Sequence, residues 1–235
     1  MKTNLKLSGL NHNKEVLFGL LQLIIVLGLM FNPWTVFPFT FIIIIIVILM
    51  FTYWKHCSLS EVGLKTDLGI VKIVGSALLL FTIIEPIFDF IVQPLINSIV
   101  NESPNYSLFQ FIAHDSSKYL KYISFIWISA AIGEELLFRG FMFMQLKLII
   151  PEVRYKTFLM ILISAVIFSL PHAYQGLSGL LTTFVFGMIF GIVYVKFNYN
   201  LWITILLHGF IDSFFITLAY MDKLDYYSIA NFLTN

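Results

Sequence analysis

The sequence has few charged residues and almost no cysteine. Only 11% of its 235 residues are Asp, Glu, Lys or Arg, whereas soluble domains contain about 25%. Cys57 is the only cysteine, so an intrachain disulfide is excluded and we expect an inert packing thiol. The net charge of +1 and the lack of a basic tract exclude nucleic acid as a partner, because phosphate binding needs clustered Lys and Arg.

Hydrophobic residues make up 59% of the chain and are concentrated in long runs. A run of about 20 apolar residues can span the hydrocarbon core of a bilayer. The runs therefore predict an all-α, polytopic transmembrane helix bundle with about seven spans in one integral membrane domain (1–235), with the lipid bilayer as its solvent. The expected spans are residues 16–31, 36–54, 70–100, 119–149, 156–173, 178–196 and 200–220. Glu85-Pro86 interrupts the third run, so there are eight spans if that run is split.

The distribution of Lys and Arg predicts that the N-terminus lies in the cytoplasm, because positively charged loops are retained on that side. With this orientation, most of the basic residues face the cytoplasm: Lys2, Lys6, Lys14, Lys55, Lys65, Lys72, Lys147, Arg154, Lys156 and Lys196. Three others, Lys118, Lys121 and Lys223, face out. The richness in Ile, Phe, Asn and Lys is typical of an AT-rich bacterial genome, so we expect an integral protein of a bacterial plasma membrane.

The fourth run contains three ionisable residues, in the pattern E-E-x-x-x-R at residues 134–139. Such a residue at the bilayer centre costs about 2.5 to 3.5 kcal/mol, so each is a functional candidate. Glu135 and Arg139 are four residues apart and can form an ion pair on one helix face. Glu134 points about 100° away and remains as a carboxylate that can act as a general base. Taken alone, the pattern equally fits a structural ion pair between helices.

Two later runs contain histidines at helical spacing. His172 is at the end of the fifth run, with Phe168 one turn earlier on the same face, and Pro171 predicts a bend. In the seventh run, His208 and Asp212 are four residues apart, so Asp212 can fix the tautomer of the imidazole or position a water. A single membrane histidine is commonly a packing residue. Three patterns on three spans together favour a catalytic site on the fourth, fifth and seventh spans.

The ordered set E-E-x-x-x-R, F-x-x-x-H and H-x-x-x-D, each on its own apolar run, resembles the CPBP family of intramembrane proteases. This family is also called Abi, or the CAAX protease and bacteriocin-processing family. The resemblance covers residues 119–220, the expected catalytic core, and the set as a whole is more specific than any of its members. The first hundred residues add only hydrophobicity to it.

The resemblance implies roles for individual residues. Glu134 would activate water together with His172, and His208 with Asp212 would stabilise the oxyanion of the tetrahedral intermediate. The family often has asparagine at the position of Asp212, so we expect Asp212 to be protonated or to orient His208. The supporting residues would be Glu135, Arg139 and Phe168.

The cofactor remains open at this level. Glu134, His172 and His208 could form a three-ligand zinc site with an open position for water, as in a metalloprotease. A glutamate-dependent, metal-free enzyme would use the same residues. The sequence is compatible with both.

The resemblance implies a membrane-embedded, CAAX-prenyl-protease-like endopeptidase. Its substrates would be hydrophobic, lipidated, leader or signal peptides, or segments of membrane proteins, because a water-poor site accepts an unwound apolar peptide. Bacterial members are associated with bacteriocin processing, self-immunity and peptide signals, which makes a prenylated CAAX substrate less favoured. The family includes the eukaryotic endopeptidase that trims prenylated CAAX proteins, and the resemblance to it implies substrate access from the cytoplasmic side.

Three other functions are compatible with parts of the sequence. Gly176-Leu177-Ser178-Gly179 resembles the G-x-S-G of rhomboid serine proteases, with His208 as partner of Ser178. Buried Glu, His and Asp could form an ion path in a small transporter, although no inverted repeat is visible. A catalytically silent family member could act by binding, as a membrane scaffold or a bacteriocin-immunity protein.

Overall fold

The structure is a computed structural model that describes residues 2–56 and 58–229, so the expectation for Cys57 lies outside the described residues. The described residues form helices and contain no strand, which confirms the all-α prediction. The α-helices are α1 (Lys2–Met30), α2 (Phe39–His56), α3 (Ile70–Ile87), α4 (Gln93–Val100), α5 (Ser116–Phe125), α6 (Met142–Ile149), α7 (Lys156–Ser169), α8 (Gly176–Lys196), α9 (Leu201–Tyr220) and α10 (Tyr226–Ile229). Shorter 3₁₀ segments are Leu59–Val62, Ser107–Ile112 and Leu170–Gln175.

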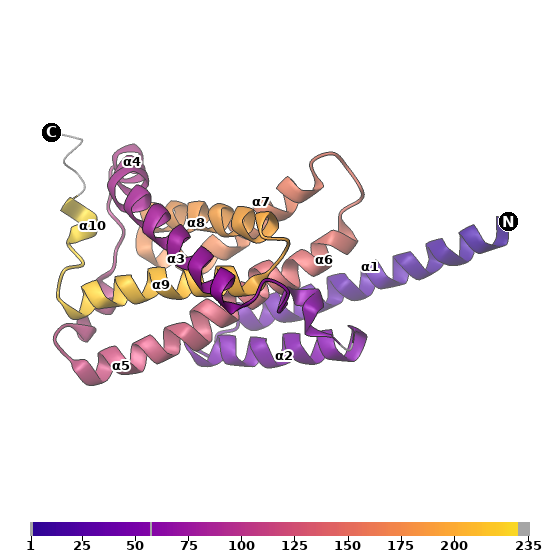
Figure 1. Ribbon diagram of the computed structural model, residues 1–235, viewed down its shortest axis with the longest axis horizontal. Coiled ribbons are helices and arrows are strands. Elements are labelled where there is room, and N and C mark those ends of the chain that lie inside the picture. The colour runs from indigo at the N-terminus through magenta and orange to yellow at the C-terminus, as the bar shows by residue number, and fades with distance from the viewer. Residues whose placement is uncertain (1, 57, 230–235) are drawn as a thin grey trace.

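The long helices form an up-and-down bundle (Figure 1). The pairs that pack against each other include α1 with α2 and α6, α3 with α9, and α7 with α8. The connection 101–115 and the segment 221–229 lie at the end of the bundle far from the N-terminus, which we call the distal end. The larger hydrophobic core is shared by most of the long helices, from Leu23 of α1 to Ile211 of α9, and a smaller one contains Ile112, Ile126 and Ile216.

Four helical stretches are long and apolar enough to cross a membrane: His12–Met30, Ile70–Val100, Lys156–Lys196 and Leu201–Tyr220. The chain is an integral membrane protein. α2 is apolar but shorter, and the helical stretch from Ser116 to Ile149, with its charges at Glu134, Glu135 and Arg139, is not among the four. The count of seven spans stays a prediction. Ile70–Val100 is continuous despite Pro86, so the structure does not support splitting the third span.

The Lys156–Lys196 stretch is a hairpin of α7 and α8, joined by the 3₁₀ segment Leu170–Gln175. A Cβ on Gly187 would lie 2.8 Å from the Cα of Ala165, and one on Gly191 would lie 2.9 Å from Cγ2 of Ile161. These pairs run in opposite directions along the chain, so the two helices are antiparallel. Small residues let helix backbones approach this closely. The bend expected at Pro171 is present, because α-helix changes to 3₁₀-helix at Leu170.

The helix that carries Glu134 is irregular in the middle. Between α5 and α6, residues Ile126–Glu134 and Leu136–Phe141 are π-helical, and a third π segment, Phe88–Val92, joins α3 to α4. π-Helical turns are rare in proteins, and those that occur are often found at functional sites.

Two capping residues fix where the site-bearing helices begin. The Asp115 side chain accepts a hydrogen bond from the backbone N–H of Lys118 at 3.0 Å, and this bond and the Lys118 ammonium lower the pKa of the Asp115 carboxyl. The Asn200 side chain accepts from the N–H of Trp202 at 3.2 Å and so starts α9, about two turns before His208.

Candidate active site

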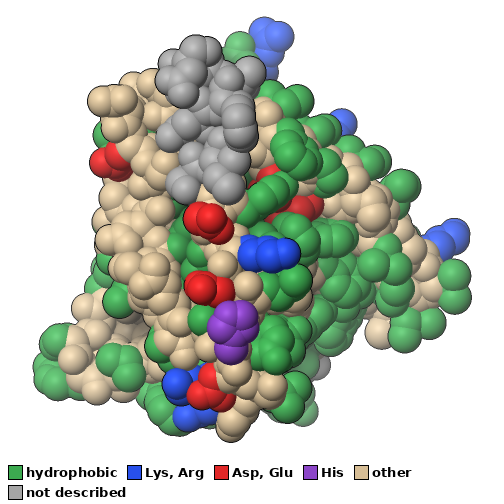
Figure 2. All heavy atoms as spheres, turned by 90° about the vertical axis from the view of Figure 1, so that its left-hand side faces the viewer, with side chains coloured by type: hydrophobic (Ala, Val, Ile, Leu, Met, Phe, Trp, Pro, Cys, Tyr) green, Lys and Arg blue, Asp and Glu red, His purple; other side chains and the backbone are tan. Residues whose placement is uncertain are grey.

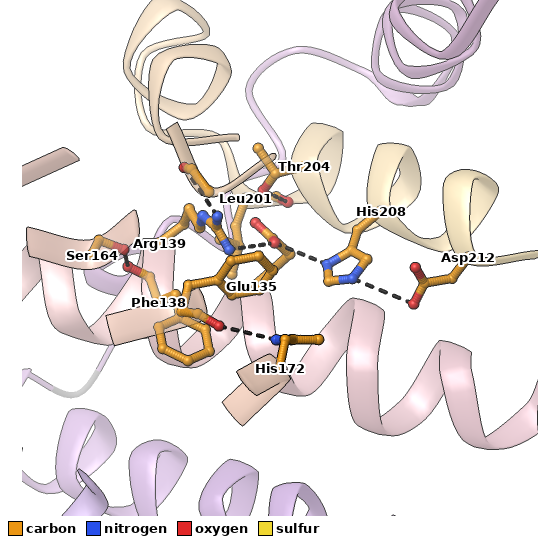
Figure 3. A network of polar contacts seen from close by, with 11 residues as sticks. Glu135, Phe138, Arg139, Ser164, His172, Leu201, Thr204, His208 and Asp212 are labelled. Carbon is orange, nitrogen blue, oxygen red and sulfur yellow. Dashed lines mark hydrogen bonds and ion pairs between the residues drawn. The ribbon is translucent and has the colours of Figure 1, made fainter. Parts of the chain in front are cut away.

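Glu135 and Arg139 form the ion pair that their spacing predicts. Nη1 of Arg139 donates to Oε1 of Glu135 at 2.8 Å, and both side chains are fully buried (Figure 3). Nη2 of Arg139 donates to the carbonyl oxygen of Gly187 at 3.2 Å. The guanidinium lies over the ring of Phe168, with Cζ 4.4 Å from the ring centroid. This pair therefore holds α8 and α7 against the π-helical segment.

His208 lies between two carboxylates (Figure 3). Its Nδ1 is 3.0 Å from Oε1 of Glu135, and its Nε2 is 3.4 Å from Oδ2 of Asp212. The ring also stacks on Phe190, with centroids 5.1 Å apart. Because a carboxylate accepts hydrogen bonds, Nδ1 donates to Glu135, and Nε2 is the nitrogen that faces Asp212. The contact with Asp212 agrees with the expected orienting role of that residue.

His172 is held by the backbone of the helix that precedes it. It lies on the 3₁₀ segment after α7, and its Nδ1 is 3.2 Å from the carbonyl oxygen of Phe168 (Figure 3). A carbonyl can only accept, so Nδ1 carries the hydrogen and Nε2 keeps a lone pair. This arrangement suits a group that accepts a hydrogen bond from water. Phe168 therefore makes two contacts in the site: its ring supports Arg139, and its carbonyl orients His172.

Glu134 differs from its neighbour Glu135. Its side chain is buried, with 8% of the residue exposed, and within the described part of the chain it has no hydrogen-bond partner. Glu135 accepts two hydrogen bonds through one oxygen. The divergence of the two carboxylates expected from the helix geometry is therefore present. Glu134 is the carboxylate that is available for a reactant.

Glu134, His172, His208 and Asp212 line one cavity of about 580 Å³. Most of its remaining wall is aromatic or apolar, and the distal end contributes Tyr106, Leu108, Phe109 and Tyr227. Viewed from the distal end, charged side chains of both signs lie in a band beside hydrophobic surface (Figure 2). With the N-terminus in the cytoplasm this end faces out. The expected access from the cytoplasmic side therefore does not agree with the predicted orientation.

The candidate zinc ligands do not come together as a three-ligand site. In residues 2–56 and 58–229, no three His, Cys, Asp or Glu side chains form a group that could hold a metal ion. Both ring nitrogens of His208 already have a carboxylate neighbour. The residues present do not fit a preformed zinc site.

Ser178 does not pair with His208. Its hydroxyl donates to Oδ1 of Asn97 at 2.6 Å and accepts from Nε2 of Gln93 at 3.2 Å. The side chain is completely buried between α4 and α8. The Ser-His dyad of the rhomboid-like alternative is therefore absent from this arrangement, and Ser178 belongs to a structural hydrogen-bond network.

The cavity residues that were not predicted as part of a site include three polar residues of the third run: Glu85, Asp89 and Gln93. The sequence interpretation used Glu85 only as part of an interruption of the third run. Their spacing of four residues, continued by Asn97, is the signal that could have identified them, because it places polar groups on one face of an otherwise apolar helix.

Neither a curated protein nor a solved structure matches the chain. Residues 116–214 match a family model, described as Type II CAAX prenyl endopeptidase Rce1-like. The matched segment contains all four of the residues that line the cavity as candidate catalytic groups, and it begins and ends close to the expected core of residues 119–220. The family supports an intramembrane protease of the CAAX type as the kind of function. This match, over residues 116–214, is to the family that the motifs resemble.

Proposed function

We propose that the protein is an intramembrane endopeptidase that hydrolyses a peptide bond of a hydrophobic, lipidated or leader peptide. The single observation that carries this proposal is the convergence of Glu134, His172, His208 and Asp212 on one cavity. These side chains come from three separate parts of the chain. They combine an open carboxylate, an oriented histidine and a second histidine held by carboxylates, which is the set of groups that acid–base hydrolysis needs.

Water activation is the proposed role of Glu134 and His172. The Glu134 carboxylate takes one proton from a water molecule, while Nε2 of His172 accepts a hydrogen bond from the other water proton. The water oxygen then forms a bond to the carbonyl carbon of the peptide, and the carbonyl electrons move to its oxygen. The orientation of His172 by the Phe168 carbonyl supports this step, because it leaves Nε2 as the acceptor.

Stabilisation of the oxyanion is the proposed role of His208. Its Nδ1 is engaged by Glu135, and the contact of Nε2 with Asp212, at 3.4 Å, is longer than a normal hydrogen bond of about 2.7 to 3.2 Å. Between these two carboxylates His208 carries a hydrogen on both ring nitrogens, so its Nε2–H can turn from Asp212 to the developing negative charge of the oxyanion. When the intermediate collapses, the C–N bond breaks and the proton held by Glu134 passes to the leaving nitrogen.

The cavity wall supports an apolar peptide as substrate. Aromatic side chains from several helices line it, including Phe88, Phe168, Phe186 and Phe190. A peptide segment in this space is removed from water and would have to be extended, because a helix satisfies its own backbone groups and shields the scissile bond. A bacterial plasma membrane with a cytoplasmic N-terminus is the setting we propose for this reaction.

A comparison of cleaved peptides tests the proposal. Cells that produce wild-type protein and cells that produce Glu134→Gln, His172→Gln or His208→Gln are compared by mass spectrometry of membrane and secreted peptides. We expect new peptide termini with wild type and none with these three variants. Glu152→Gln is the matched control, because this carboxylate is exposed on the surface in an ion pair with Lys156. Equal peptide patterns in wild type and Glu134→Gln, at equal protein levels, would leave the scaffold or immunity function as the better explanation.

A further inference from the structure

Two buried acidic residues outside the family-matched segment line the candidate active site. Glu85 lies in α3, and Asp89 lies in the π-helical segment that follows Pro86. Only 6% of Glu85 and 7% of Asp89 is exposed, and both line the cavity that contains Glu134 and His208. Their four-residue spacing places the two carboxylates close to each other on one side of the helix.

Within the part of the chain that the structure describes, the two carboxylates have no basic partner. No Lys, Arg or His side chain of the described residues lies within ion-pair distance of Glu85 or Asp89. Oε2 of Glu85 is buried without a hydrogen-bond partner, and Asp89 accepts a hydrogen bond from the side chain of Tyr226. Burying carboxylates without a counter-charge is costly, and two of them also repel each other. A cation from outside the protein would offset both costs.

An aromatic row connects this pair to the candidate catalytic histidine. Phe88 stacks on Phe186 with ring centroids 3.7 Å apart, Phe186 stacks on Phe190 at 5.9 Å, and Phe190 stacks on His208 at 5.1 Å. α3 also packs along α9, where Phe81 contacts Phe210 and Phe214. The acidic pair and the candidate catalytic residues therefore lie on adjoining walls of the same cavity, with apolar surface between them.

We propose that Glu85 and Asp89 form an anionic subsite that binds a Lys or Arg side chain of the peptide substrate. The inference rests on the proposed peptidase function, because it assigns a specificity determinant to the same cavity. The ammonium or guanidinium group would bridge the two carboxylates, while apolar residues of the peptide pack on the aromatic row. The subsite would thereby place the peptide in one register relative to Glu134.

Binding can be measured without cleavage in the Glu134→Gln protein. The full chain is reconstituted in lipid nanodiscs and titrated with acetylated, amidated and otherwise apolar peptides. In one set a single Lys is moved along the peptide, and matched sets carry norleucine or Glu at the same position. We expect at least one Lys position to bind about tenfold or more tightly than its norleucine counterpart, and the Glu peptide to bind worst.

Variants of the acidic pair test whether this preference comes from the subsite. In the double variant Glu85→Gln, Asp89→Asn, the ratio of the affinity for the Lys peptide to that for the norleucine peptide should fall towards one. Asp222→Asn is the control, since Asp222 is an exposed acidic residue at the distal end that does not line the cavity, and it should keep the wild-type ratio. No Lys preference in the starting protein, or an unchanged preference in the double variant, overturns the subsite.

Cleavage of the same peptides by the protein with Glu134 intact separates the two proposals. Cleavage without a Lys preference would overturn the subsite and leave the peptidase standing. A Lys preference that depends on Glu85 and Asp89, with no peptide cleaved, would support the subsite and count against the peptidase.

Discussion

Glu135 accepts a hydrogen bond at 3.0 Å from Nδ1 of His208, a residue 73 positions later in the chain and on another helix. The same oxygen, Oε1, accepts from Arg139 at 2.8 Å, while Oε2 is buried without a partner. Glu135 is thus the point where the buried ion pair meets the candidate catalytic histidine. Its role is to position His208 rather than to contact the substrate, because its carboxylate does not line the cavity.

Glu135→Gln should reduce turnover more than substrate affinity. The neutral amide is a weaker acceptor, so His208 is held less firmly at the place where it acts on the transition state. We expect kcat to fall by about 10- to 100-fold, as is common when the partner of a functional histidine is removed, with KM almost unchanged. Steady-state kinetics on the folded fraction measure both constants. A rise in KM at constant kcat would show that Glu135 serves substrate binding instead.

Arg139→Ala should destabilise the protein. Breaking a buried ion pair by removing one partner costs about 3 to 5 kcal/mol, because the other charge stays buried. The change also removes the hydrogen bond to the Gly187 carbonyl and the contact with Phe168. Thermal unfolding in detergent and the yield of folded protein report the effect. Arg139→Lys keeps the charge but not the planar group, so it should lie between wild type and Arg139→Ala.

Contacts within one helix could be predicted from the sequence, because the helical repeat determines which residues face each other. The pairs Glu135–Arg139 and His208–Asp212 are both four residues apart and are both in contact. The π-helical segments around Glu135 have no such signal, since a π turn depends on the packing of neighbouring helices rather than on local propensity. The hydrogen bond between Glu135 and His208 also depends on how the helices pack, so the spacing of residues within one helix does not predict it.

Glu85 and Asp89, the acidic pair of the third run, were not predicted as part of the site for a different reason. Glu85 is followed by Pro86, and proline inside a helix is most simply interpreted as a kink. Asp89 and Gln93 then continue the spacing, but only the packing of α3 and α4 against α9 and α8 turns that face to the cavity. The fold class and the identity of the candidate residues were accessible from the sequence, whereas the composition of the cavity wall was not.

Ser178→Ala should lower stability without abolishing cleavage. The substitution leaves Asn97 and Gln93 short of a partner in a buried network, which costs about 1 to 3 kcal/mol. Because the hydroxyl does not contact His208, the activity of each folded molecule should stay close to wild type. Thermal unfolding and kinetics on purified protein test the two effects separately. Complete loss of activity in a stable Ser178→Ala protein would favour a serine mechanism.

Removal of divalent metals should leave cleavage intact. A zinc ligand needs a free ring nitrogen, and both nitrogens of His208 face carboxylates, Glu135 on one side and Asp212 on the other. Activity is measured after treatment with a strong chelator, together with the metal content of the purified protein. Loss of activity on chelation, with recovery on adding zinc, would show that these side chains rearrange around a metal.

Substrate should reach the cavity from the distal end. Leu108 is 63% exposed there and also lines the cavity, whereas a second hollow at the opposite end is lined by Glu15, Lys55 and Lys147 and contains none of the candidate catalytic residues. If the N-terminus is cytoplasmic, the distal end faces out, and so would the access route.

Single cysteines in a Cys57→Ser background test this orientation with a membrane-impermeant maleimide. Leu108→Cys should be labelled in intact cells, and an apolar peptide that binds the cavity should slow its labelling. Lys196→Cys, at the C-terminal end of α8 and at the other end of the bundle, should be labelled only after the membrane is opened. The reverse pattern would place the N-terminus outside and restore access from the cytoplasm, because the cavity and Leu108 lie at the same end whichever way the bundle is inserted.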